Sequence, residues 1–163
     1  MLKRILLIIT VFSFMFISVG ATTHSSSYNH QFIKTTYKDD IEIKTIISSK
    51  GELKSLYEKY KDTLYLEHRE KVYSDSTIGF IDAIEKYDEE YFKENNLIII
   101  YLTEPSGSIT HEIKDISINE ERICISIKQN YPEYLTCDMA GWLLILEIEK
   151  DLNVTDIIIK MKG

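Results

Sequence analysis

The centre of the fold is encoded by residues 97–102, which read Leu97, Ile98, Ile99, Ile100, Tyr101 and Leu102. Both the odd and the even positions are apolar, so a strand formed here carries apolar side chains on both faces. A strand with one face in water alternates apolar with polar residues instead. The stretch therefore predicts a central strand with protein packed against each of its faces.

Extended segments continue from residue 102 to the end of the chain. Between residues 109 and 118 the apolar positions change from odd to even, which predicts a β-bulge near Lys114 and Asp115. The connections are short, and short connections favour antiparallel neighbours. Three further strands are expected at residues 123–127, 142–149 and 156–161.

Upstream of residue 96 the clearest period is helical. Ser49 is followed three residues later by Glu52, the spacing of a capping box at the start of a helix. Apolar residues then recur at helical spacing, which predicts a helix over residues 50–62. A second helix is expected near residues 88–94, with Asp88 as its N-cap. Residues 63–79 show no clean period and are not assigned.

The segment before the first helix is expected to form a hairpin. Residues 32–37 and 41–47 are rich in β-branched and aromatic residues, with Asp39 and Asp40 at a turn between them. With helices early and strands late, the fold class is α+β. We expect a twisted, mainly antiparallel sheet, in a sandwich-like arrangement, with one or two helices packed on it.

Residues 1–21 have the order of a secretory signal peptide. Lys3 and Arg4 precede an apolar run at residues 5–19, and small residues follow up to Ala21. The run is shorter than the roughly 20 residues that a spanning helix needs, so we expect cleavage after Ala21, with an uncleaved anchor as the alternative. No cysteine lies near the junction to carry a lipid. A secreted, extracytoplasmic protein with no stable membrane anchor is expected.

The mature chain is acidic. Cleavage removes two basic residues and no acidic one, so the net charge moves from −7 to −9. This charge repels phosphate backbones, which argues against nucleic-acid binding. Residues 22–31 are polar and are expected to form a flexible spacer, and residues 32–163 are expected to form a single α+β domain.

Two segments rich in polar, small and aromatic residues stand out at 104–112 and 131–142. The first is a Pro-Ser-Gly-Ser turn that enters a strand, and the second is a long connection between strands. Loops of this kind carry binding residues more often than cores do, while ordinary hairpin chemistry is the alternative for the first. The candidate binding residues are Ser106, Ser108, His111, Glu112, Tyr131, Tyr134 and Asp138.

Cys137 and His111 are a candidate catalytic pair, since a thiolate beside an imidazole is a recognised nucleophile. The alternative for His111 is a ring hydrogen-bonded inside the sheet, because it shares the parity of Ile109 and Ile113. The alternative for Cys137 is a disulfide with Cys124, which would contribute about 3 kcal/mol outside the cell. The sequence has no spaced pair of metal ligands and no phosphate-binding loop, so neither a metal nor another cofactor is expected.

Three runs of the sequence resemble a family of uncharacterised exported proteins from Gram-positive bacteria. The likeness covers roughly the last half of the chain. The runs are residues 87–92, Ser106 to Ser108 followed by His111 and Glu112, and residues 136–140 followed by Trp142.

More distantly, a strand, a Ser-Gly turn, a second strand and a later Tyr-Pro pair resemble the C-terminal domain of PrcB-type protease-complex subunits. That family carries a double glycine and an aromatic residue after its serine, where this chain has Ser108 and Ile109. The resemblance implies a protease as the partner, and neither likeness assigns a catalytic residue.

Together these patterns give two functional hypotheses. The first is a non-enzymatic module outside the cytoplasm that binds another exported protein, such as a protease, through segments 104–112 and 131–142. The second is a hydrolase or transferase that uses Cys137 and His111. The oxidation state of the two cysteines distinguishes them, because a disulfide would remove the nucleophile.

Overall fold

The computed structural model describes residues 28–66 and 79–163. The predicted signal peptide, spacer residues 22–27 and most of the unassigned stretch 63–79 lie outside the described residues. In the described part of the chain, no helix is long and apolar enough to cross a membrane.

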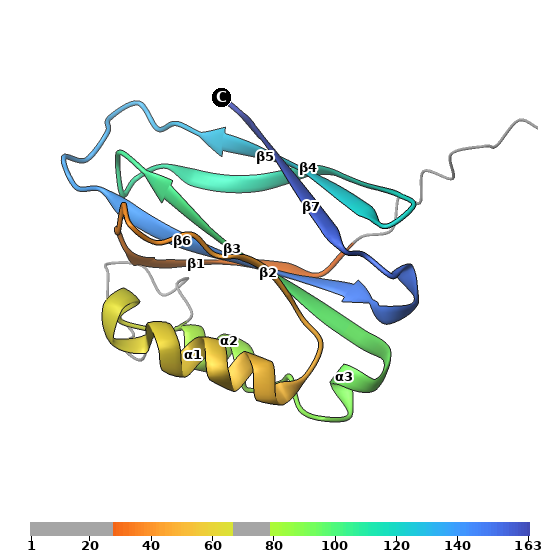
Figure 1. Ribbon diagram of the computed structural model, residues 1–163. Helices are drawn as coiled ribbons and strands as arrows, with labels where there is room; N and C mark the ends of the chain where they lie inside the picture. The colour runs from red at the N-terminus through yellow and green to blue at the C-terminus, as the bar shows by residue number, and fades with distance from the viewer. Residues whose placement is uncertain (1–27, 67–78) are drawn as a thin grey trace, which may run out of the picture.

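The described residues form three layers (Figure 1), with helices on one face of a four-stranded sheet and a three-stranded sheet on its other face. The order in the first sheet is β1-β6-β3-β2, and in the second it is β4-β5-β7. This arrangement confirms the α+β class and the sandwich-like packing. The strands are β1 (His30–Thr36), β2 (Lys44–Ile47), β3 (Asn95–Glu104), β4 (Thr110–Asn119), β5 (Arg122–Asn130), β6 (Ala140–Glu149) and β7 (Asp156–Lys162). The helices are α1 (Lys50–Leu64), α2 (Phe80–Ile84), α3 (Tyr91–Glu94) and the 3₁₀ turn η1 (Lys150–Leu152).

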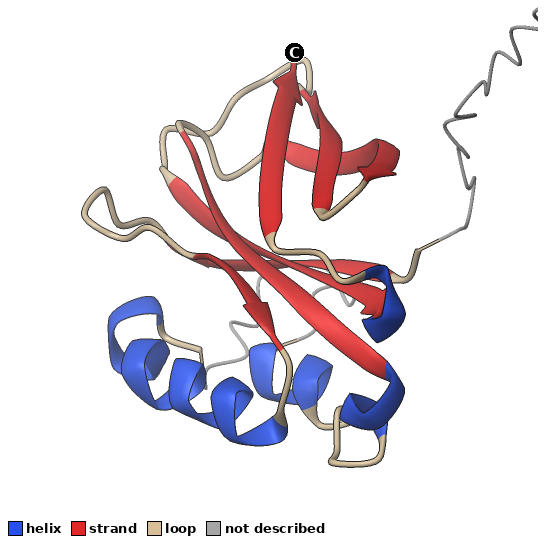
Figure 2. Cartoon of the chain, turned by 45° about the vertical axis from the view of Figure 1, so that its right-hand side comes forward, coloured by secondary structure: helices blue, strands red, loops and turns tan. Residues whose placement is uncertain are grey.

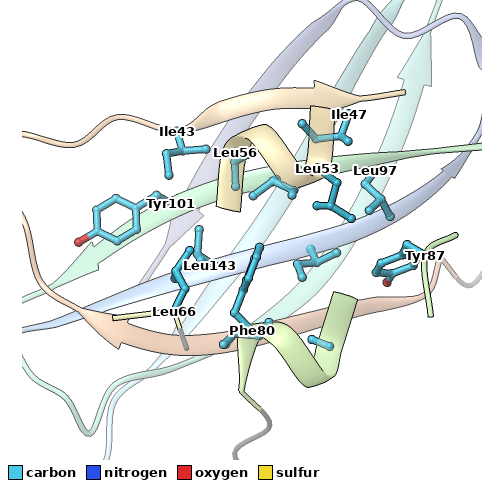
Figure 3. Packing of buried hydrophobic residues seen from close by; sticks show 14 of the residues in the cluster. Ile43, Ile47, Leu53, Leu56, Leu66, Phe80, Tyr87, Leu97, Tyr101 and Leu143 are labelled. Carbon is cyan, nitrogen blue, oxygen red and sulfur yellow. The ribbon is translucent and has the colours of Figure 1, made fainter. Parts of the chain in front are cut away.

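Strand β3 is a central strand covered on both faces, as residues 97–102 predict. It pairs antiparallel with β6 on one side and with β2 on the other. Leu97, Ile99 and Tyr101 pack into the core under the helices. Figure 3 shows Leu97 and Tyr101 in this core. Ile98 and Ile100 pack into the second core, between the two sheets. Because successive side chains of β3 point to opposite faces of the sheet, this one strand contributes apolar residues to both cores.

Helix α1 begins where the sequence predicts and ends at Leu64, two residues beyond the expected end. The Ser49 hydroxyl accepts a hydrogen bond from the N–H of Glu52 at 3.2 Å, which caps the first turn. The Glu52 carboxylate returns to the N–H of Ser48 at 2.8 Å, one residue earlier than in a standard capping box. Tyr65, with a left-handed φ of 53°, ends the helix.

The predicted hairpin of residues 32–37 and 41–47 is wrong. Strands β1 and β2 lie at opposite edges of the sheet. The long strands β3 and β6 pair with each other at its centre, and β1 then pairs with β6 while β2 pairs with β3. Residues 37–43 cross the end of the sheet between these edges. The Tyr101 hydroxyl holds this crossing: it accepts from the N–H of Lys38 at 2.7 Å and donates to the carbonyl of Thr36 at 2.9 Å.

The second predicted helix is shorter than expected. The N-cap is Glu90, not the predicted Asp88, although the Asp88 carboxylate accepts from the N–H of Tyr91, the first helical residue, at 2.9 Å. The helix is limited to α3, because Asn95 already belongs to β3. A further short helix, α2, was not expected from the sequence, and it buries Phe80 and Ala83 in the core beneath the first sheet.

The second sheet contains the predicted bulge and one parallel pair. Strands β4 and β5 are antiparallel, with a register shift between Ile113 and Asp115 that confirms the bulge. Strand β7 pairs parallel with β5, because β6, which lies between them in the sequence, belongs to the other sheet (Figure 2). The fold is therefore mainly antiparallel with a single parallel exception among the described strands.

Candidate functional site

The two segments that stand out in the sequence meet at one end of the sandwich. One loop joins β3 to β4, and the other joins β5 to β6 (Figure 1). The N–H of Gly107 donates to the carbonyl of Asp138 at 2.7 Å. The N–H of Thr136 donates to the hydroxyl of Ser108 at 3.2 Å. We refer to these contacts, together with those of Ser106, as the loop junction.

Ser106 holds the junction from inside. Its hydroxyl lies 2.9 Å from that of Ser108 and 3.0 Å from that of Thr136. Only 1% of Ser106 is exposed, whereas Ser108 is half-buried. Short hydroxyl side chains that bond one another and the backbone fix the relative position of two loops. Ser106 and Ser108, two of the candidate binding residues, therefore hold the two loops together.

A lysine from the neighbouring edge strand also joins the junction. The Lys34 ammonium, on β1, donates to the carbonyl of Gly107 at 3.0 Å and lies 3.9 Å from the Asp138 carboxylate. A Cβ at Gly107 would collide with that carboxylate, so the absence of a side chain permits the contact. A hydrogen bond from the side chain of Thr136, and the charge of Lys34, hold the pKa of Asp138 below its ordinary value. The carboxylate is thus ionised and paired.

The loop between β5 and β6 carries large apolar side chains in an exposed position. We call residues 131–139 the apolar loop, because it contains four of the large hydrophobic residues that are exposed in the described chain. Tyr134 is 79% exposed, so nearly its whole side chain is in contact with water. The four residues are Tyr131, Tyr134, Leu135 and Met139.

A polar cluster lies between the two sheets, directly beneath the loops. Glu104, at the end of β3, is 1% exposed. Its carboxylate lies 2.6 Å from Nε2 of His111 and accepts two hydrogen bonds, at 2.8 and 2.9 Å, from the amide of Gln129. His111 and Gln129 are register partners on β4 and β5. We call these three residues the inter-sheet cluster, because hydrogen bonds cross from one sheet to the other.

Aromatic rings enclose the histidine of the inter-sheet cluster. Phe32 stacks on His111 with 5.2 Å between ring centroids, and Trp142 meets it edge-on at 5.3 Å. The side chain of His111 has no exposed area. This confirms the interpretation of His111 as a ring hydrogen-bonded inside the sheet. Nδ1 of His111 and Nε1 of Trp142 have no hydrogen-bond partner among the described residues.

The structure does not join Cys137 to His111. Cys137 is exposed, and no hydrogen bond of the described residues links it to the buried ring. The candidate disulfide is contradicted as well, since both cysteines are free. Cys124 pairs with Ser117 and lies six residues before the end of β5, about 20 Å of strand from the apolar loop. A disulfide requires Cα atoms within about 7 Å of each other.

We therefore expect both thiols to be available for reaction in the folded protein. Without reductant, Cys137 should react with iodoacetamide before Cys124, because Cys137 is exposed and Cys124 is half-buried. After unfolding in urea both should be alkylated, which intact mass measures as two adducts. The Cys137→Ser variant should keep only the slow reaction. A protein that gains no adduct after unfolding would contradict the free thiols.

Glu112 lies apart from the junction. It is exposed on β4, and its carboxylate is 2.7 Å from the ammonium of Lys114, which lowers the pKa of Glu112. Nowhere in residues 28–66 and 79–163 do three histidine, cysteine or acidic side chains form a group that could hold a metal ion.

Glu104, Gln129 and Lys34 are site residues that were not among the candidates predicted from the sequence. Glu104 and Gln129 continue the inward parity of apolar strand residues, Ile98 to Leu102 and Ile123 to Ile127 respectively. A polar residue at an inward position of an apolar strand requires a buried partner, and that signal was present. The sequence contains no local pattern that marks Lys34, because its contact with Gly107 depends on the pairing of β1 with β6. Comparison with known proteins adds no relative, because no family model, curated protein or solved structure matches the chain.

Proposed function

We propose that this protein is a non-enzymatic binding module that acts outside the cytoplasm and holds another exported protein on its apolar loop. The observation that carries the proposal is the exposure of Tyr131, Tyr134, Leu135 and Met139 on one loop whose base is fixed by hydrogen bonds. Exposed apolar side chains gathered in one place cost solubility, and they commonly mark an interaction site.

The composition of the loop suits a protein partner. Tyrosine and methionine are enriched in protein interfaces, and tyrosine is frequent among the residues that carry most of the binding energy. The loop junction reduces the freedom of this loop before binding, through the contacts of Ser108 and Asp138. A preordered loop loses less conformational entropy when it binds, so more of its contact energy contributes to affinity.

The predicted signal peptide supports a partner outside the cytoplasm. The resemblance to PrcB-type subunits favours a protease among such partners. The role of the inter-sheet cluster in this proposal is support: it fixes the ends of β3 and β5, from which the two loops leave.

We predict that shortening two apolar side chains of the loop strongly reduces capture of the partner. The Tyr134→Ser/Leu135→Ser double variant, immobilised and exposed to the secreted fraction of the producing cell, should recover at least tenfold less partner than the unmodified protein. The reason is that losing one central interface side chain costs about 2 kcal/mol. Quantitative mass spectrometry of the recovered proteins measures the difference.

Ile81→Ser is the matched control. Ile81 is an exposed apolar residue of α2, in the helical layer away from the apolar loop (Figure 1). This variant should capture as much partner as the unmodified protein, and all variants should keep the same unfolding midpoint. Equal recovery by the double variant and the unmodified protein would refute the proposal.

A further inference from the structure

Strand β7 has a free edge. It pairs with β5 on one side, and no other described strand pairs with it (Figure 2). Its register with β5 is unbroken from Asp156 to Lys162, and it contains no proline. The backbone N–H and C=O groups on the free side of such a strand can pair with another extended chain.

The opposite edge of the same sheet is built differently. Strand β4 contains the bulge between Ile113 and Asp115, and Glu112 and Lys114 form an ion pair beside it. A bulge interrupts the regular backbone geometry that a further strand pairs with. The two edges are therefore not equivalent, and β7 is the one with regular backbone geometry.

The C-terminal part of β7 carries positive charge, whereas Asp156 at its start forms an ion pair with Arg122. Lys160 and Lys162 are exposed on the same face of the strand, and Lys162 is the register partner of Lys128 on β5. Neither Lys160 nor Lys162 forms an ion pair with a described residue. Like charges placed opposite each other destabilise a sheet. Lys128, Lys160 and Lys162 thus form a local positive charge in a chain whose net charge is −7.

These lysines select the kind of strand that can pair. They repel the β7 edge of a second copy of the chain, which argues against self-association. They attract a segment that carries carboxylates at alternate positions, because such a segment places its negative charges beside Lys160 and Lys162.

The C-terminal end of β7 lies beside the apolar loop. A Cβ at Gly163, just beyond β7, would lie 3.8 Å from Cε2 of Tyr131, so the end of the strand touches the first residue of the loop. Met161, near the end of β7, is also exposed. Tyr131 and Met161 therefore lie at or near the C-terminal end of β7.

We propose that the partner binds through an extended acidic segment, which adds a strand to the free edge of β7 and contacts Tyr131 at its end. This inference rests on the proposed function and names the chemistry of the partner. Main-chain hydrogen bonds to β7 supply the pairing, and the lysines supply the preference for acidic sequences.

The test uses the secreted protein and three synthetic peptides of equal length. The first alternates Glu with Val, the second alternates Lys with Val, and the third is the Glu peptide with alternate backbone nitrogens methylated. Only the first should bind, and it should slow hydrogen exchange of the β7 amides at least tenfold. Binding, measured by fluorescence anisotropy, should weaken when salt is raised from about 0.01 M to about 1 M.

Charge-reversal variants locate the binding. Lys160→Glu/Lys162→Glu should weaken binding of the Glu peptide at least tenfold. The control, Lys50→Glu/Lys54→Glu, makes the same change of charge on exposed residues of α1 and should leave binding unchanged. The proposal is overturned if the Glu peptide does not bind, if the methylated peptide binds equally well, or if the β7 variant binds normally.

Failure of this inference is distinguishable from failure of the proposed function. If capture of the natural partner depends on Tyr134 and Leu135 but is unaffected by the β7 variant, the acidic strand is wrong and the binding module stands. If capture is independent of the apolar loop, the proposed function itself is wrong.

Discussion

Replacing Glu104 by Ala is expected to lower the free energy of unfolding by about 3 kcal/mol. The carboxylate is the hydrogen-bond partner of both His111 and Gln129, and all three side chains meet between the sheets. Without it, two polar groups stay buried with no acceptor, and each such group costs about 1–3 kcal/mol. Urea unfolding followed by the fluorescence of Trp142, the single tryptophan, measures the loss.

Two further variants separate the hydrogen bonds from the charge. Glu104→Gln retains the shape and one acceptor, so we expect a loss about half as large. Glu112→Ala, at an exposed glutamate of β4, should leave the unfolding midpoint unchanged. A Glu104→Ala loss below about 1 kcal/mol would mean that the inter-sheet cluster is not a structural link, because a typical single hydrogen bond contributes that much.

Replacing Gly141 by Ala is expected to cost a similar amount, about 3 kcal/mol, for a steric reason. Gly141 lies in β6, paired with Thr35 on β1 and Thr103 on β3. A Cβ there would lie 2.5 Å from the carbonyl oxygen of Thr36 and 2.6 Å from the ring and the hydroxyl of Tyr101. Neither group can move freely, because the Tyr101 hydroxyl bonds the backbone at Thr36 and Lys38.

A double-mutant cycle checks this cause. In a Tyr101→Ala background the new methyl group loses one of its collisions, so Gly141→Ala should cost at least 1 kcal/mol less, within the range measured for contacting residues of about 0.5–3 kcal/mol. The matched control is Gly51→Ala in α1, where the nearest atom would be 3.9 Å away. That change should stabilise the helix by up to about 1 kcal/mol. Equal costs for Gly141→Ala in both backgrounds would exclude the Tyr101 collision.

The sequence predicts the parts of this fold that depend on local patterns. The two-sided strand, the helix after Ser49 and the bulge at Asp115 all follow from the period of apolar residues over a few positions. The pairing of β1 does not, because its partner β6 is remote in the sequence and no local feature specifies it. The hairpin prediction was wrong because it assumed that neighbours in sequence pair in space.

The candidate site shows the same division. Loop composition located the two segments of the junction, and strand parity placed His111 inside the sheet. The exposure of Tyr134 and the approach of Lys34 to Gly107 depend on pairings and contacts between segments that are remote in the sequence. Residue type and spacing do not contain that information.

The pairing of β1 with β6 also sets an order of events during folding. Thr36 finds its partner Ala140 only after more than a hundred intervening residues are present. Chains dominated by such remote contacts fold slowly, in about milliseconds to seconds, because loop-closure entropy is lost before the pairing is gained. Strand β7 pairs with β5 in parallel, and the whole of β6 lies between these two strands in the sequence. Because β6 pairs with β1 and supplies residues to both cores, neither core is complete until most of the chain is present.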